Sequence, residues 1–199
     1  MLKIPYDKRI PPLSRIQVDS LSSYKDLKNP QHQWDYKIPK SKTTGADCYM
    51  INNYLRGLIH PNDKDVKQII ELIKNINSAI HAIPNTENRI LFRGYTNPNR
   101  ILELKRGEFF IEDAFVSSTE SKDVAVYYAT KNQDVTTPVI SMCQYNSTIP
   151  MIYFDEDEEE WLLPPKLEFK VTSINNLKMR DEKGKIRNGK LFKLKRIIT

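Results

Sequence analysis

Six consecutive acidic residues, 155–160, lead without a linker into the apolar segment 161–163. Acidic runs usually form solvated loops, but the last residues of this run must lie at the edge of the core because the apolar strand begins directly after them. On an extended chain Glu158 and Glu160 point to the same side, where two carboxylates repel each other unless a cationic substrate or transition state takes up the field. The remaining acids of the run are interpreted as exposed charges that attract a basic substrate: Asp155, Glu156, Asp157 and Glu159.

Two further segments carry side chains that could bind a ligand. Arg93 is predicted at the end of the apolar strand 90–92, beside Gly94, and a guanidinium next to bare peptide groups can clamp a phosphate or a carboxylate. Ser117-Ser118-Thr119 offers three hydroxyls after an apolar strand, which could hold a catalytic side chain or cap the helix predicted near Lys122. Taken singly, a surface ion pair and a helix cap explain these segments better than a binding site does.

Composition indicates one globular domain of 199 residues with a net charge of +6 and a pI of about 9.1. Many basic residues lie between 183 and 196, where they alternate with apolar residues as on the solvent face of an edge strand. We therefore expect no nucleic-acid partner, since an aromatic-basic ribbon is also missing. Cys48 and Cys143 lie far apart, without metal-ligand spacing, and are predicted to be free thiols in a chain that binds no metal.

The sequence predicts no membrane span, because none of its apolar runs approaches the roughly 20 residues that a bilayer requires. Charge and proline interrupt the apolar character of residues 1–7, which argues against a secretory signal. We expect a cytoplasmic location, or delivery into a target cell by a route that needs no such signal.

Hydrophobic periodicity predicts helices first and strands after them. Helical spacing is found within 44–59 and again after Asp63, a candidate N-cap, as far as Pro84, and a short helix is expected around 124–128. Apolar segments separated by turn residues predict strands at 139–145, 151–154, 161–163, 167–173 and 191–198, with turns at 181–184 and 188–189. This order of elements predicts an α+β fold with mostly antiparallel strands.

Taken together, Arg93 after a strand, Ser117-Ser118-Thr119, and Glu158-x-Glu160 before Trp-Leu-Leu-Pro resemble the R-S-E class of mono-ADP-ribosyltransferases. The clostridial binary-toxin and exoenzyme type is the most similar. The surrounding context agrees in three segments: 49–56, which is similar to the helix before the arginine strand, 124–129 after the hydroxyl motif, and 167–171 as the final core strand. The resemblance spans residues 45–175, and the order and spacing of its motifs make it more specific than any one of them.

The resemblance implies a fold and a division of the chain. N-terminal helices are expected to pack on a core of two mostly antiparallel β-sheets that form an NAD cleft. Residues 1–44 are expected to be a lead-in packed on the body, and residues 45–199 the catalytic domain. We expect a monomer.

The resemblance also implies an activity, the transfer of ADP-ribose from NAD to a protein side chain with release of nicotinamide. Glu160 would stabilise the oxocarbenium-like ribose, and Ser117 would hold Glu160 by a hydrogen bond. Glu158 would select the acceptor, because the Glu-x-Glu form goes with arginine acceptors and a carboxylate can align a guanidinium and remove its proton.

NAD is therefore expected as a substrate, held by a second set of residues. Arg93 would bind a diphosphate oxygen or the nearby ribose, and the backbone of Gly94 would meet the nicotinamide amide. Tyr128 would cover the nicotinamide ring, and Lys131 would reach the phosphates. Ser118 and Thr119 complete the predicted NAD-binding segment.

The chain departs from the family pattern in three places. Its middle motif is Ser-Ser-Thr where Ser-Thr-Ser is usual, and Tyr128 stands where phenylalanine is common. The segment from Tyr145 to Glu158 is short and contains Pro150, which predicts an abbreviated loop for reading the protein substrate. Two alternatives stay open: an NAD glycohydrolase that uses the same residues, and a noncatalytic interaction module on the same fold.

Overall fold

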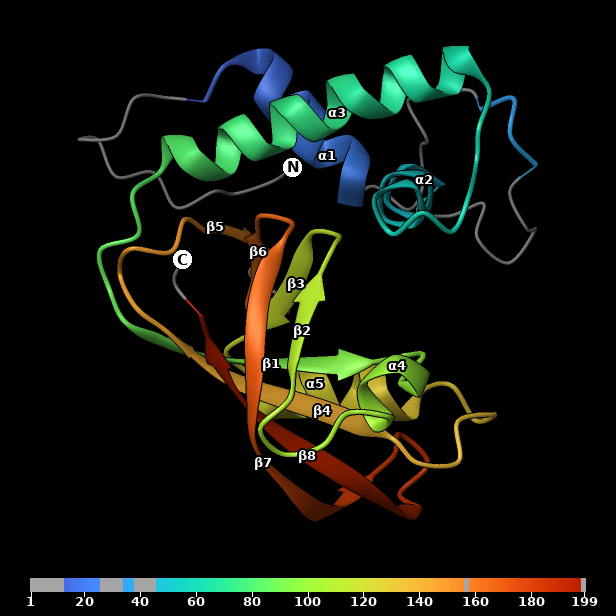
Figure 1. The fold of residues 1–199 in the computed structure, drawn as a ribbon, viewed down its shortest axis with the longest axis vertical. Coiled ribbons are helices and arrows are strands. Elements are labelled where there is room, and N and C mark those ends of the chain that lie inside the picture. The colour runs from blue at the N-terminus through green and yellow to red at the C-terminus, as the bar shows by residue number, and fades with distance from the viewer. Residues whose placement is uncertain (1–12, 26–33, 38–45, 156–157, 198–199) are drawn as a thin grey trace.

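The computed structural model describes residues 13–25, 34–37, 46–155 and 158–197, which form a layer of helices above a twisted sheet (Figure 1). The helices of the layer are α1 (Arg15–Lys25), α2 (Ala46–Leu55) and α3 (Asp63–Ala82). The strands follow them in the chain, with two short helices, α4 (Asn99–Leu102) and α5 (Lys122–Thr130), inserted between strands. The predicted α+β class is confirmed.

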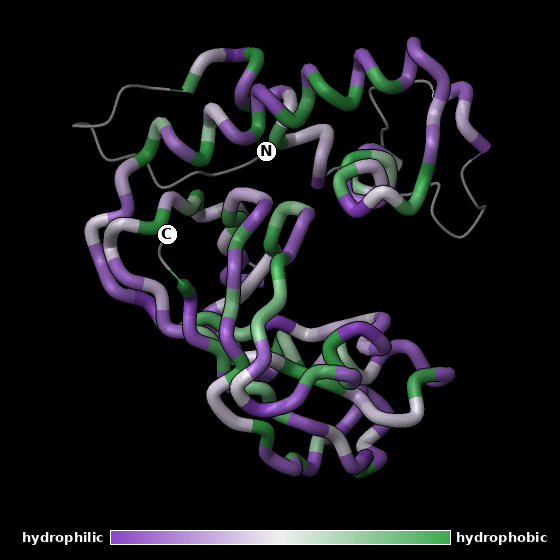
Figure 2. Tube along the Cα trace, in the orientation of Figure 1, coloured by the Kyte–Doolittle hydropathy of each residue, from purple (hydrophilic) through white to green (hydrophobic). Residues whose placement is uncertain are grey.

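The helical layer is held together by apolar stripes at helical spacing. On α3 the buried side chains Ile69, Leu72, Ile76 and Ile80 recur every three or four residues, and Figure 2 shows the alternation along this helix. Leu21 of α1 joins the same cluster, so part of the predicted lead-in is a regular helix. The N-cap of α3 is Asn62 and not Asp63, because the Asn62 side chain accepts a hydrogen bond from the Asp65 amide at 2.9 Å.

The eight strands join in one sheet with the order β2-β7-β8-β4-β1-β3-β6-β5. The pairs are antiparallel except β4 with β8, which is parallel. The strands are β1 (Arg89–Tyr95), β2 (Phe109–Glu112), β3 (Val116–Thr119), β4 (Val139–Tyr145), β5 (Ile152–Asp155), β6 (Glu160–Leu163), β7 (Leu167–Arg180) and β8 (Ile186–Arg196).

The structure has one continuous sheet, whereas the resemblance implies two, and the junction between β1 and β3 accounts for the difference. A single residue pair, Phe92 with Thr119, connects these two strands. In Figure 1, β3 stands upright beneath the helical layer, whereas β1, β4 and β8 cross the lower part of the molecule. Hydrogen bonding therefore continues through the junction, but the strands on its two sides run in different directions.

Apolar side chains pack on both sides of this junction. Phe115, Ile152 and Leu162 belong to the same cluster as the helices, so the strands on the β3 side are fixed to the helical layer. A second cluster, which includes Leu91, Phe169 and Phe192, fills the space among the lower strands. The cleft described below lies where these two packed regions meet.

The C-terminal strands differ from their predicted form. β8 is not an edge strand, because it lies between β7 and β4. The predicted turn at Asn188-Gly189 is part of β8, and a Cβ on Gly189 would lie 2.4 Å from the Pro138 carbonyl oxygen, so the glycine allows a close approach of two chain segments. The actual turn is at 181–184, where Gly184 has φ +79°. In the part of the chain that the structure describes, no helix has the length and apolar character needed to cross a membrane.

Candidate active site

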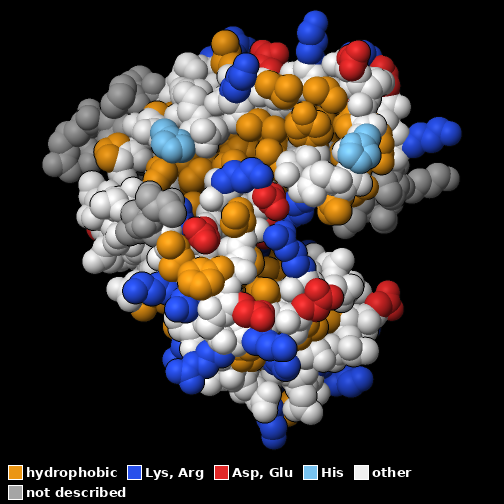
Figure 3. Space-filling model, viewed as in Figure 1, with side chains coloured by type: hydrophobic (Ala, Val, Ile, Leu, Met, Phe, Trp, Pro, Cys, Tyr) orange, Lys and Arg blue, Asp and Glu red, His pale blue; other side chains and the backbone are white. Residues whose placement is uncertain are grey.

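A cleft of about 300 Å³ lies between the helical layer and the sheet. Its walls come from the end of α1, from α2, from β1 and β3, from α5, and from the start of β6. The volume is at the lower end of the range for small-molecule sites. Figure 3 shows the molecule notched between its upper and lower parts, with acidic and basic side chains close together on that face.

Glu160 and Ser117 meet in this cleft because β3 and β6 pair in antiparallel register. Thr119 lies opposite Glu160 in that pairing, and Ser117 is two residues further along the same strand, on the same face. The Ser117 hydroxyl donates a hydrogen bond to Oε1 of Glu160. Glu160 is 9% exposed, so the carboxylate is largely withdrawn from water but borders the cleft.

The other two hydroxyls of the motif have different neighbours. Thr119 Oγ1 donates to the Glu158 carbonyl at 2.6 Å and accepts from the Ser121 amide at 3.0 Å, which ties the acidic segment to the start of α5. Ser121, and not the motif itself, is the N-cap of α5. Ser118 is buried opposite Trp161 and borders both the cleft and the small pocket on the far face of β1.

Glu158 borders the same cleft, as predicted, but the prediction that it reaches the side of Glu160 along an extended chain is wrong. Glu158 lies in a turn and not on an extended strand, and Glu159 has φ 45°. The Tyr128 hydroxyl of α5 donates to Oε1 of Glu158, which aims that carboxylate into the cleft. Burial and this hydrogen bond to a carboxylate raise the pKa of Tyr128, so its phenol stays protonated as a donor. Glu156 and Asp157 lie outside the described residues, and Glu159 is exposed as expected.

The cation that the crowded carboxylates require is present within the chain. Lys25, the last residue of α1, places its Nζ 3.0 Å from Oε2 of Glu160 and 3.9 Å from Oε2 of Glu158. Sequence reasoning missed it because the contact joins positions 135 residues apart, and no local pattern marks Lys25.

Arg93 lies within β1, opposite Ser141, and is followed by two more strand residues. Its Nη1 is 3.3 Å from Oε2 of Glu112, and both Nε and Nη2 of Arg56 lie 3.1 Å from Oε1 of the same carboxylate. Burial raises the pKa of Glu112, but Arg93 and Arg56 outweigh that effect and hold it below its usual range. Glu112 therefore joins α2, β1 and the end of β2, a role that the sequence did not reveal.

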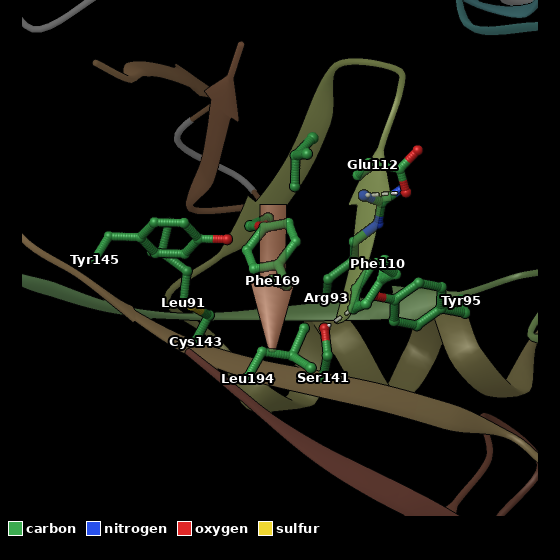
Figure 4. A pocket seen from close by; sticks show the side chains of 12 residues that line it. Leu91, Arg93, Tyr95, Phe110, Glu112, Ser141, Cys143, Tyr145, Phe169 and Leu194 are labelled. Atoms are coloured by element: carbon green, nitrogen blue, oxygen red, sulfur yellow. Dashed lines mark hydrogen bonds and ion pairs between the residues drawn. The ribbon is translucent and has the colours of Figure 1, made fainter. Parts of the chain in front are cut away.

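Figure 4 shows the small pocket on the other face of β1, which Arg93 also borders. The Arg93 guanidinium points toward Glu112 there and lies 5.2 Å from the centre of the Tyr95 ring. The Tyr95 hydroxyl and the Ser141 hydroxyl are 3.1 Å apart and hydrogen-bonded. Glu112 and the Tyr95 ring therefore hold Arg93 on the side of the small pocket, and Arg93 also lines the cleft.

Gly94 is required by the packing of α5 on β1. A Cβ at this position would lie 2.0 Å from the Ala125 carbonyl oxygen and 2.9 Å from Cβ of Tyr128. The same close approach brings Tyr128 to the cleft. Lys131 lies over the aromatic rings that follow, with Nζ 4.0 Å from the centre of Tyr128 and 5.7 Å from that of Tyr127.

Asn52 of α2 is a cleft residue that the sequence argument did not single out. Its Nδ2 donates to the Tyr24 hydroxyl at 2.8 Å and to Cys48 Sγ at 3.2 Å. Its Oδ1 is buried at the cleft and has no hydrogen-bond partner among the described residues. A buried acceptor left in this state is costly, which suggests a donor group on a ligand as its partner.

A sequence model of the ADP-ribosyltransferase exoenzyme family matches residues 41–193, which include every cleft segment except the end of α1. The chain belongs to this family. The resemblance read from Arg93, the hydroxyl motif and the Glu-x-Glu segment is thereby confirmed at the level of the family. No curated protein sequence matches the chain.

Solved structures of ADP-ribosyltransferase toxins have the same fold. The enzymatic component C2-I of the C2-toxin from Clostridium botulinum superposes with a TM-score of 0.63 at 16% identity, covering 93% of this chain and 44% of that one. The ADP-ribosylating toxin BECa of a C. perfringens binary enterotoxin, solved with NADH, gives 0.66 at 15% identity, with 93% and 44% covered. The Clostridium limosum C3 exoenzyme gives 0.58 at 15% identity, with 94% and 87% covered. The chain thus spans less than half of the two binary-toxin components.

Metal ligands do not gather in the described parts of this exoenzyme-family chain. No group of three or more His, Cys, Asp or Glu side chains there is placed to hold an ion. Cys48 and Cys143 are both free thiols, and Cys48 borders the cleft. The described lining of the cleft offers carboxylates, hydroxyls and the Arg93 guanidinium.

Proposed function

We propose that the chain is a mono-ADP-ribosyltransferase that transfers ADP-ribose from NAD to a protein side chain and releases nicotinamide. The observation that carries the proposal is the hydrogen-bonded pair of Ser117 and Glu160, set at the edge of a cleft that Arg93 also lines. Family membership supports the same reaction class. The pairing of β3 with β6 makes this arrangement rigid, because the two side chains are fixed by one ladder of backbone hydrogen bonds.

Glu160 acts on the sugar in this proposal. The bond between nicotinamide and ribose breaks early and leaves positive charge on the ribose, which a nearby carboxylate stabilises electrostatically. Ser117 holds Glu160 in one orientation, so the carboxylate does not have to reorganise as the charge develops. Loss of one such preorganised group typically lowers kcat by about 10²- to 10³-fold.

The remaining cleft residues fit the rest of the dinucleotide. Arg93 offers a guanidinium to the diphosphate or to a ribose, and Tyr128 offers an aromatic face to the nicotinamide. The unpaired Oδ1 of Asn52 offers an acceptor for a hydroxyl or amino group of NAD. Lys131 lies against the ring of Tyr128, and we assign it to support of that ring rather than to the phosphates.

The proposed acceptor is an arginine side chain. Glu158 lies beside Glu160 at the open part of the cleft, where it can align an incoming guanidinium and take its proton. Support for this choice comes from the Lys25 ammonium, which shows that a cation is bound at this position by the two carboxylates.

The test is incubation of the purified chain with labelled NAD and a cell lysate, followed by mass-spectrometric mapping of the modified side chain. We expect Glu160→Gln to lower NAD turnover about 10²-fold or more, because it removes the charge opposite the developing cation. Glu159→Gln is the matched control, since Glu159 is the exposed neighbour and should keep full activity.

Three results would contradict the proposal in different ways. Turnover by Glu160→Gln within twofold of the unaltered chain would exclude Glu160 as the catalyst. Release of nicotinamide without any labelled protein would make the chain an NAD glycohydrolase. An absence of both would leave a noncatalytic member of the family.

A further inference from the structure

Lys25 lies between Glu158 and Glu160. In the proposed function, the same place is taken by the positive charge of the ribose and of the acceptor guanidinium. The Lys25 side chain is 26% exposed, against 12% for Glu160 and 36% for Glu158, so the contact with Glu160 is the better shielded of the two. It is also the only basic residue in the last turn of α1, where the helix dipole favours a cation. The ammonium is thus held from the helix side and from the carboxylate side.

An ammonium at this position opposes the chemical step. Glu160 can stabilise a cationic ribose only with charge that is not already neutralised, and a second cation beside the ribose would repel it. NAD cleavage therefore requires that Lys25 leave Glu160. Water and other neutral acceptors cannot take over the contact that Lys25 makes, because they carry no positive charge.

A guanidinium can take over that contact. It is planar, carries five donors and binds a carboxylate through two parallel hydrogen bonds, whereas an ammonium acts as a point charge. The part-exposed Glu158 is the carboxylate that an incoming side chain reaches first, since it is the more accessible of the pair. When the acceptor binds Glu158, it weakens the attraction of the two carboxylates for the Lys25 ammonium, so Lys25 can leave Glu160.

We propose that Lys25 is a specificity-determining residue that couples NAD cleavage to the arrival of a cationic acceptor and so suppresses NAD hydrolysis. The inference rests on the proposed function and deepens it. In transfer, the bond from ribose C1 to the nicotinamide nitrogen breaks with both electrons leaving on nicotinamide, a guanidinium nitrogen bonds to the same carbon, and its proton passes to Glu158. In hydrolysis a water oxygen takes the place of that nitrogen and its proton goes to solvent.

The test compares Lys25→Met, which keeps much of the side-chain volume but removes the charge, with Lys25→Arg, which retains a cation. Lys64→Met is the matched control, because Lys64 forms an equally short ion pair, 3.0 Å from Asp35, far from the cleft. Nicotinamide release is measured with NAD alone and with NAD plus agmatine, a small soluble guanidinium. The ADP-ribosyl-agmatine product is measured in parallel.

Lys25→Met should raise acceptor-free hydrolysis about tenfold while transfer to agmatine changes by less than about threefold. Lys25→Arg and Lys64→Met should keep the ratio of hydrolysis to transfer of the unaltered chain. Hydrolysis by Lys25→Met that is unchanged or lower would overturn the inference, and a fall would assign Lys25 a supporting role at Glu160 or on NAD. If the unaltered chain and all variants leave NAD intact, the proposed function fails and this inference fails with it, a result distinct from an active chain in which Lys25 has no effect.

Discussion

At the scale of single residues, the cleft separates two carboxylates that look equivalent in the sequence. Glu160 is nearly buried and receives the Ser117 hydroxyl, whereas Glu158 is part-exposed and receives the Tyr128 hydroxyl. The first arrangement suits a fixed charge that acts on the sugar, and the second suits a group that meets an incoming side chain. Different hydrogen-bond donors thus support different roles for two residues that are two positions apart.

Substitution of Glu158 by Gln should separate these roles. The change preserves shape and removes the charge and the proton acceptor, so NAD hydrolysis should persist while transfer to a guanidinium falls by about 10²-fold. Product analysis with agmatine measures both reactions in one assay. Undiminished transfer by this variant would rule out an arginine-directed role for Glu158 and reopen the identity of the acceptor.

The residues that could be predicted from sequence are those whose signal is local. The hydroxyl motif directly follows apolar residues and the acidic run directly precedes an apolar strand, so both segments could be found locally. The sequence also predicts that Glu158 and Glu160 crowd each other, but the extended spacing used for that prediction is wrong, because Glu158 lies in a turn. Lys25 and Glu112 could not be found in this way, because each acts through partners far away in the chain. Charge pairing over such separations is set by the fold and leaves no periodic pattern.

At the scale of elements, β1 and α5 pack against each other at close range beside the cleft. Gly94 permits this packing, and an added methyl group would meet backbone atoms of α5 that cannot rotate away. The helix carries Tyr128 and, through it, the position of Glu158. Displacement of α5 would therefore alter the cleft as well as the stability of the sheet.

Gly94→Ala is expected to destabilise the chain by about 1–3 kcal/mol, the usual cost of overpacking, and to reduce NAD turnover at the same time. Thermal unfolding and nicotinamide release measure the two effects. Gly184→Ala is the control, because it introduces a strained positive φ in a hairpin turn with nothing within 4 Å of the new methyl group. That variant should lose stability but keep its turnover, and retention of full stability by Gly94→Ala would contradict the packing described for α5.

Most elements were predicted at close to their observed positions, and the errors have physical causes. The α3 stripe and the strand after the acidic run have strong periodicity. Strand order leaves no periodic pattern in the sequence, so the sequence predicts β8 at an edge of the sheet, whereas in the structure it lies between β7 and β4. The residue types of Asn188-Gly189 predict a turn because they favour one, whereas in the structure the glycine allows close contact with Pro138.

At the scale of the whole molecule, Glu112 connects the helical layer to the sheet. Arg56, directly after α2, and Arg93 within β1 share this one carboxylate, which is 8% exposed. Removal of its charge would leave two guanidinium groups facing each other with little access to water. Such losses are strongly destabilising, because an uncompensated charge stays behind.

Glu112→Gln should therefore lower the free energy of unfolding by about 3–5 kcal/mol near neutral pH. Asp113→Asn is the matched control, since Asp113 is only half-buried and pairs at 2.8 Å with the exposed Lys166, so that this substitution should cost about 1 kcal/mol or less. Denaturant unfolding at several pH values measures both.

The pH dependence follows from the lowered pKa of Glu112. Because the folded-state pKa lies below the ordinary value of 4.5, the contribution of Glu112 is complete above that value and is lost as the pH falls through the lower, folded-state pKa. Glu112→Gln should show a shallower loss of stability on acidification than the unaltered chain. If the free energy of unfolding falls equally steeply with acidification in both proteins, Glu112 does not stabilise the fold through its ion pairs.

The narrow junction between β1 and β3 has a mechanical consequence for the cleft. Arg93 and Gly94 directly follow Phe92 on one side of the junction. On the other side, Ser117 is two residues from Thr119 on β3, and Glu160 lies opposite Thr119 on β6. Ser117 and Glu160 belong to the same side of the junction, so their contact does not depend on the angle at which β1 meets β3. In the proposed function NAD contacts residues on both sides of the junction, Arg93 on one side and Glu160 on the other. Under that proposal, a change in the angle between β1 and β3 should weaken NAD binding before it disturbs the Ser117–Glu160 hydrogen bond.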